Sequence, residues 1–116
     1  MRIGIDLGGT TIQVGRVDNG TLREVHSGST PASEPKETVL KKIFELVDRL
    51  PAEEADSIGA GVPGMVDVKA GIVYDVQNIP SWTEVALKER IEARYGVPAY
   101  VHNDANCFAL AEHRFG

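Results

Sequence analysis

The chain has 116 residues, enough for one domain, and its 42% hydrophobic and 25% charged residues favour a packed core and exclude a disordered chain. The formal net charge is −5 and the lysines and arginines are scattered, which argues against a nucleic-acid-binding surface. No apolar run is long enough to cross a bilayer, the first residues lack a secretory signal, and the single cysteine, Cys107, excludes an internal disulfide. We therefore expect a cytoplasmic protein with no membrane or nucleic-acid partner.

The chain opens on a short apolar run, residues 1–7, whose β-branched residues predict a buried strand. Asp6 lies at the end of this strand, where its carboxylate could hold a hydrated Mg²⁺. Glycines allow positive φ and leave room for a bulky anion, so the next turn could hold phosphate oxygens on its backbone N–H groups. A plain hairpin turn explains the same glycines, and this stretch alone leaves both interpretations open. The turn consists of Gly8, Gly9, Thr10 and Thr11.

A second strand is predicted over residues 11–17, followed by a hairpin turn at Asn19 and Gly20, because Asn-Gly tolerates positive φ. A third strand over residues 21–27 completes an antiparallel meander. Its inward-facing residues are expected to be Leu22 and Val25.

Ser33 and Pro35 predict the start of a helix, with Ser33 as its cap and Pro35 in its first turn, and Pro51 ends the pattern. A polar connection, 52–56, leads to a fourth strand over residues 57–62. The helix carries one apolar stripe for packing on the sheet: Val39, Leu40, Ile43, Phe44, Val47 and Leu50.

The turn at Gly64 follows the fourth strand, and a small hairpin is predicted over residues 65–74. The irregular stretch 75–82 contains Asn78 and Trp82, whose amide and indole suit a hydroxylated ligand or simple loop packing.

A second helix should be capped by Ser81 or Thr83 and end at Gly96. A fifth strand, 99–102, and a last helix, 105–115, complete the predicted elements. The second helix presents an inner face of Leu87, Ile91 and Tyr95.

Strands that alternate with helices predict an α/β fold with a five-stranded mixed sheet, three antiparallel strands followed by parallel ones. Ligands of such sheets bind at the carboxyl ends of the strands. Asp6, Gly64 and Asp104 each lie at the carboxyl end of a predicted strand. We therefore expect these residues to share one site.

Asp104 is either the N-cap of the last helix or a general base. A sugar hydroxyl that attacks a γ-phosphoryl group gains from a carboxylate that accepts its proton, and Asn103 could bind neighbouring hydroxyls. Phosphoryl transfer needs no covalent nucleophile, so Cys107 is expected to be a small buried residue. The histidines do not have a metal-ligand spacing.

Four motifs together resemble the ROK family, which contains repressors and sugar kinases, including bacterial glucokinases. They are 6–11 (DLGGTT), 61–64 (GVPG), 78–82 (NIPSW) and 103–112 (NDANCFALAE). The resemblance spans nearly the whole chain and implies that residues 1–116 form the amino-terminal lobe of an actin-like (ribonuclease H-like) ATPase fold.

The resemblance implies an ATP-dependent transferase that phosphorylates a hexose such as glucose. Asp104 matches the catalytic base, Asn103 a sugar-hydroxyl contact, Gly64 a sugar-side backbone contact and Asn78 a motif near the sugar. The turn after Asp6 matches the phosphate loop for ATP and Mg²⁺.

The family's kinases also carry a second lobe with a Glu-x-Gly-His sugar motif, a cysteine-rich structural zinc site and a second glycine-rich nucleotide segment. These features are absent from the 116 residues, so we expect an isolated lobe with little or no turnover.

Three alternatives remain. A ROK-type regulator would use this lobe as a sugar sensor, but its DNA-binding segment would precede Asp6. A two-metal nuclease would need more converging acids than the strand ending near Gly64 supplies. The lobe could also self-associate as a symmetric homodimer.

Overall fold

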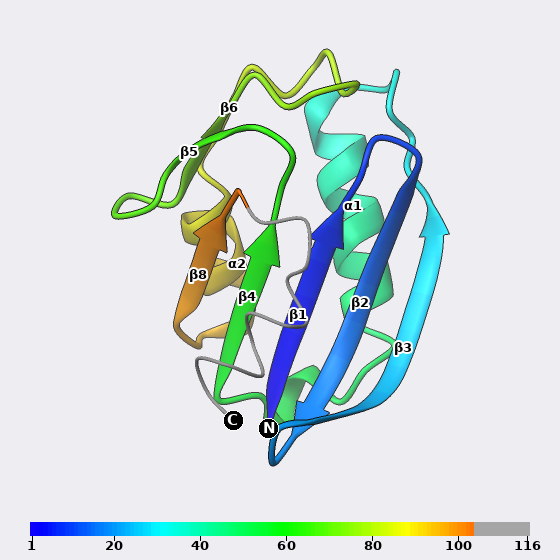
Figure 1. The fold of residues 1–116 in the computed structure, drawn as a ribbon, viewed down its shortest axis with the longest axis vertical. Coiled ribbons are helices and arrows are strands. Elements are labelled where there is room, and N and C mark those ends of the chain that lie inside the picture. Colours follow the sequence, from blue (N-terminus) through cyan, green and yellow to red (C-terminus); the bar gives the residue numbers. More distant parts are fainter. Residues whose placement is uncertain (104–116) are drawn as a thin grey trace.

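The computed structural model describes residues 1–103. Its centre is a five-stranded sheet with strand order β3-β2-β1-β4-β8 (Figure 1). β1 pairs antiparallel with β2 and parallel with β4, and β4 pairs parallel with β8. The predicted mixed sheet is thus confirmed. Its strands are β1 (Arg2–Leu7), β2 (Thr11–Asp18), β3 (Thr21–Ser29), β4 (Ser57–Gly61) and β8 (Ala99–His102).

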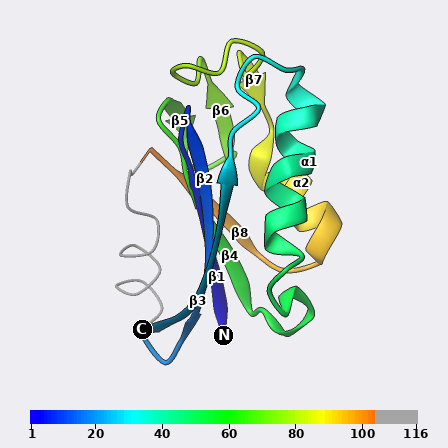
Figure 2. The same ribbon diagram turned by 90° about the vertical axis from the view of Figure 1, so that its right-hand side faces the viewer.

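Two helices, α1 (Lys36–Val47) and α2 (Leu87–Tyr95), cover the same face of this sheet (Figure 2). The chain passes from β1 to β4 and on to β8 in one direction across the sheet, and right-handed crossovers then place both connecting helices on one side. The apolar stripe predicted for the first helix is buried in full, although its last member, Leu50, follows the end of α1, and Leu46 joins it at 1% exposure. None of the helices within residues 1–103 is long and apolar enough to span a membrane.

The core lies between this sheet face and the helices. Ile3, Ile5 and Leu7 of β1 point into it, and α2 adds Leu87 and Ile91. The intervening residues of β1 therefore face the opposite side of the sheet, because side chains alternate along a strand.

A second, three-stranded sheet lies above the carboxyl ends of the central strands (Figure 1). Its strands are β5 (Met65–Asp67), β6 (Ile72–Tyr74) and β7 (Glu84–Val85). The β5–β6 hairpin was expected, but β7 was not, and it displaces the start of α2. Ala86 is the N-cap of that helix, without a side-chain cap bond. The cap predictions are wrong because Ser81 and Thr83 both precede β7, and Ser81 Oγ donates instead to the Glu34 carbonyl.

The first helix also begins differently from the prediction. Its N-cap is Pro35 rather than Ser33, and no side chain caps it. A short 3₁₀ helix, Ala52–Glu54, occupies the expected polar connection.

Leu22 and Val25 of β3 are exposed, at 37% and 44%, so the prediction that they face inward is wrong. β3 is an edge strand, and the residues that it turns toward α1 include Gly28, which lies against Lys42 and Leu46. The hairpin before β3 is confirmed, with positive φ at Asn19 (49°) and Gly20 (76°).

Candidate phosphate and sugar site

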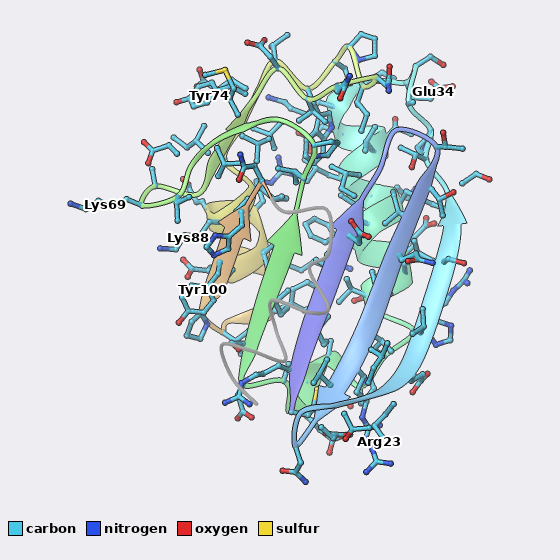
Figure 3. The ribbon with its side chains drawn as sticks, viewed as in Figure 1. Arg23, Glu34, Lys69, Tyr74, Lys88 and Tyr100 are labelled. Atoms are coloured by element: carbon cyan, nitrogen blue, oxygen red, sulfur yellow. The ribbon has the colours of Figure 1, made fainter. Side chains whose placement is uncertain are left out.

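The carboxyl ends of β1, β4 and β8 meet at one edge of the central sheet, as predicted. Asp6 of β1 is in register with Gly61 of β4, which is in register with His102 of β8. Figure 3 shows this edge below Tyr74, whereas Arg23 marks the opposite end of the molecule. Asp6 is half-buried, and its strand position puts it on the sheet face opposite the helices. The central strand β1 thus places the Asp6 carboxylate at this edge of the sheet.

Three hydrogen bonds fix the turn between β1 and β2. Gly8 N–H donates to the Thr11 carbonyl at 3.0 Å, Thr30 Oγ1 donates to the Gly8 carbonyl at 2.7 Å, and Thr30 N–H donates to the Thr10 carbonyl at 2.9 Å. Within residues 1–103 no acceptor is assigned to the N–H groups of Gly9 or Thr10. These two backbone donors at an exposed turn suit the oxygens of a phosphate group.

Thr30 was not singled out from the sequence, although it closes the turn from both sides. The only available signal is its position directly after a strand that returns alongside Thr11, and that pairing depends on the hairpin register. Its importance is therefore a product of tertiary structure.

The glycines of the turn are needed for close approach and not for positive φ. Neither Gly8 nor Gly9 has a positive φ, so that part of the prediction is wrong. A Cβ at Gly8 would lie 2.9 Å from the Thr11 carbonyl oxygen, and a Cβ at Gly9 would lie 2.7 Å from the Cβ of Asn78. Asn78, predicted near the sugar, thus lies against the predicted phosphate turn.

Gly64, three residues after β4, lies against the end of β6. A Cβ added there would be 2.9 Å from the Tyr74 carbonyl oxygen and 3.2 Å from Val76 Cα. The neighbouring Pro63 carbonyl accepts from Gln77 N–H at 3.0 Å. The turn at Gly64 and the loop that carries Asn78 are therefore joined.

Asn103 directly follows β8 and is exposed at the same sheet edge. Asp104, Cys107 and the predicted last helix lie outside the described residues. Among residues 1–103 no three His, Cys, Asp or Glu side chains are grouped to hold a metal ion.

A group of charged contacts lies away from this edge, between α1 and α2. Arg90 donates to both Glu37 carboxylate oxygens at 2.9 and 2.6 Å, and this bond lowers the pKa of Glu37. Arg94 and Tyr95 both bond to Asp48. Burial, followed by the bond to Asp48, raises the pKa of Tyr95. These contacts stabilise the helix layer and contain none of the predicted site residues.

Comparison with known proteins decides the family, because the ROK family model matches residues 2–116. The chain belongs to the ROK family. A glucokinase of Thermotoga maritima is 39% identical over 98% of this chain and 37% of its own length. The "Putative xylose repressor" of a Caldicellulosiruptor species is 34% identical over 98% of this chain and 30% of its own length.

Among solved structures, a ROK family glucokinase from Streptomyces griseus in complex with glucose and AMPPNP superimposes with a TM-score of 0.79. It is 36% identical, and the match covers 99% of this chain and 36% of the other. The ROK chain therefore has the α/β architecture of an actin-like ATPase lobe, and it spans well under half the length of these relatives.

Proposed function

We propose that this ROK chain is the amino-terminal lobe of an ATP-dependent sugar kinase that transfers a γ-phosphoryl group to a hexose hydroxyl. The observation that carries the proposal is the meeting of Asp6, the phosphate turn, Gly64 and Asn103 at one edge of the sheet. The relatives named as glucokinases make glucose the first hexose to test.

ATP and Mg²⁺ fit the described part of this site. The Gly9 and Thr10 N–H groups would hold phosphate oxygens, and the Asp6 carboxylate would hold Mg²⁺ through water. The bound metal would neutralise the charge on the phosphates. Since the fit rests on backbone donors, it requires the turn to keep its shape, which Thr30 ensures.

The sugar would lie on the β4–β8 side of the turn. Asn103 would bind its hydroxyls, with Asn78 and the backbone at Gly64 nearby. Asp104 would accept the proton of the attacking hydroxyl while that oxygen forms its bond to the γ-phosphorus and ADP leaves. The proposed cellular location is the cytoplasm, where ATP and intracellular sugars are available.

Replacement of the base tests this proposal. In the full-length protein that carries this lobe, Asp104→Asn should lower kcat by about 10²–10⁴-fold, the usual worth of a general base, while the thermal unfolding curve stays unchanged. Asp18→Asn, at the far end of β2, is the matched control and should retain activity. An unchanged kcat in Asp104→Asn would remove Asp104 from this role.

The isolated 116 residues should show little ADP release with glucose, because one lobe neither excludes water nor completes the nucleotide clamp. Robust turnover by residues 1–116 alone would contradict this expectation. The same preparation, studied by light scattering over a range of concentrations, would show whether the lobe forms the homodimer proposed for it. A single monomeric mass at every concentration would exclude the homodimer.

A second candidate function is sugar sensing within a transcriptional regulator, which the repressor relative favours. The two functions differ in a direct measurement on the full-length protein. A kinase releases ADP when glucose and ATP are present, whereas a sensor binds sugar without consuming ATP.

A further inference from the structure

The predicted phosphate turn and the predicted sugar-side loop touch where Gly9 meets Asn78. The space in which a Gly9 side chain would begin is filled by Asn78, whose Cβ is 2.7 Å from that position and whose Nδ2 is 3.4 Å from it. Real Cβ atoms do not approach another atom so closely. A residue with a side chain at position 9 therefore requires the turn or the loop to move.

Asn78 is held firmly on its side of the contact. It has a φ of 67°, in the left-handed region that asparagine tolerates better than most residues. The following Ile79 and Trp82 are buried at 1% and 0% exposure. Ile79 N–H donates to the Val76 carbonyl, and Trp82 N–H donates to the Ile79 carbonyl at 3.0 Å. The loop is thus anchored to the core on the side that follows Asn78.

The preceding side of the loop is tied to the turn at Gly64. Gln77 N–H donates to the Pro63 carbonyl at 3.0 Å, and Gly64 itself packs against Val76. A shift of the Gly64 turn or of the loop is therefore transmitted to Asn78. The turn at Gly9 is equally well fixed, because Thr30 bonds to the carbonyls on both sides of it.

We infer that the Gly9–Asn78 contact couples sugar binding to nucleotide binding, with Asn78 acting as a positioning residue for the phosphate turn. This inference rests on the proposed function. The two sides are in direct contact, so a sugar that shifts the loop at Asn78 would also shift the Gly9 and Thr10 N–H groups that would face the phosphates. Asn78 then acts on the nucleotide without touching it.

The first test is a double-mutant cycle in the full-length protein. Gly9→Ala should raise the KM for ATP by about 10- to 100-fold, because small misplacements of binding groups have effects of this size. Asn78→Gly removes the obstructing Cβ and keeps a residue that accepts positive φ. Once Asn78→Gly has removed the obstruction, adding Gly9→Ala should change the KM for ATP by no more than about twofold, which is the usual scatter in such cycles.

Gly8→Ala is the matched control. Its added Cβ would meet the Thr11 carbonyl oxygen and not Asn78, so Asn78→Gly should not rescue it. Rescue of both alanine variants, rescue of neither, or a normal KM in Gly9→Ala would each overturn the inference. If Gly9→Ala does not fold, restored folding in the double variant supports the contact, and continued misfolding contradicts it.

The second test measures coupling by equilibrium binding and needs no turnover. The Kd of AMPPNP is measured with and without saturating glucose, and the wild-type ratio should fall in the range of about 5–150-fold that is usual for coupled sites. In Asn78→Gly the ratio should fall toward 1. Loss of a mere sugar contact would weaken glucose binding equally with and without nucleotide, so an unchanged ratio overturns the inference.

The two tests separate this inference from the proposed function. A protein that binds glucose and AMPPNP cooperatively but releases no ADP would refute the kinase proposal and leave the coupling intact. An active kinase whose AMPPNP binding ratio is insensitive to Asn78→Gly would overturn the coupling inference and leave the kinase proposal intact.

Discussion

Gly64 and Gly96 are glycines for different physical reasons, and the difference can be measured. At Gly64 an added Cβ would meet the backbone of Tyr74 and Val76, whereas at Gly96 the surrounding space is open but φ is +68°. Gly64→Ala should lower the free energy of unfolding by about 1–3 kcal/mol, the usual effect of overpacking. Gly96→Ala should lower it by about 1–2 kcal/mol through left-handed strain. Urea unfolding of each variant checks both values.

Asparagine at the two positions distinguishes the causes. Gly96→Asn should recover much of the stability lost in Gly96→Ala, because asparagine tolerates the left-handed region. Gly64→Asn should be no more stable than Gly64→Ala, since it brings the same Cβ to the same backbone atoms. If asparagine recovered the same share of the lost unfolding free energy at both positions, the two glycines would not be required for different reasons.

Residue-level prediction succeeded where a residue acts through its own strand or turn. Asn19 and Gly20 have the positive φ values that their sequence predicts, and Asp6 lies near the carboxyl end of a strand, as expected. It failed where the reason lies in a distant segment. Gly9 is 69 positions from Asn78 in the sequence, and no local pattern could indicate that the two would touch.

At the level of elements, α1 and α2 are joined by a polar network whose titration can be followed. Tyr95 lies at the end of α2, is half-buried beside Phe44, and donates its hydroxyl proton to Asp48 at 2.9 Å. Burial and the adjacent carboxylate favour the neutral phenol, so the folded state raises the pKa of Tyr95. The unfolded chain then loses this proton near the usual value of about 10, before the folded chain does.

The sign of the effect follows from proton binding. Above pH about 10 the folded state holds more protons than the unfolded state, so the contribution of Tyr95 to stability is present below that pH and lost as the pH rises. In urea unfolding at pH 8–12, Tyr95→Phe should show a shallower decline than the wild type. Tyr74→Phe on β6 is the control and should keep the wild-type slope. Equal slopes in the wild type and in Tyr95→Phe would contradict the role of Tyr95.

The central strands and both helices could be predicted because hydrophobic periodicity and turn residues mark them clearly. The two-residue strand β7 could not, because Glu84 and Val85 form a strand only by pairing with β6. Because β7 occupies these two residues, α2 begins at Leu87, beyond the expected caps Ser81 and Thr83. Leu22 and Val25 were misassigned for a related reason, since an edge strand need not bury its apolar residues.

Across the whole molecule, the fold gathers the candidate site by placing parallel strands β1, β4 and β8 side by side. The alternation of strands and helices was sufficient to predict this edge, because ligand sites of open α/β sheets lie where such strands end. The contacts that shape the site were not predictable, since Thr30 and Asn78 reach the turn from separate loops. The catalytic role of Asp104 stays a prediction.

Two exposed carboxylates, Asp56 and Glu37, each join separate segments of the fold, and low pH should weaken both contacts. Asp56 accepts from the Met1 ammonium group at 2.6 Å and thereby joins the start of β1 to the start of β4, while Glu37 joins α1 to Arg90 of α2. These bonds lower the pKa of Asp56 and of Glu37 below their usual values of about 3.9 and 4.3.

A lowered pKa in the folded state means that the unfolded chain binds protons first as the pH falls. The stabilisation is therefore complete above the usual carboxyl values and is lost as the pH drops through the lower, folded values. Asp56→Asn and Glu37→Gln should each reduce the decline in the urea midpoint between pH 5 and pH 2. Glu53→Gln, on the 3₁₀ helix, is the control and should leave the decline unchanged. Both carboxylates are exposed, so added salt should diminish the differences, and salt-independent differences would contradict an electrostatic origin.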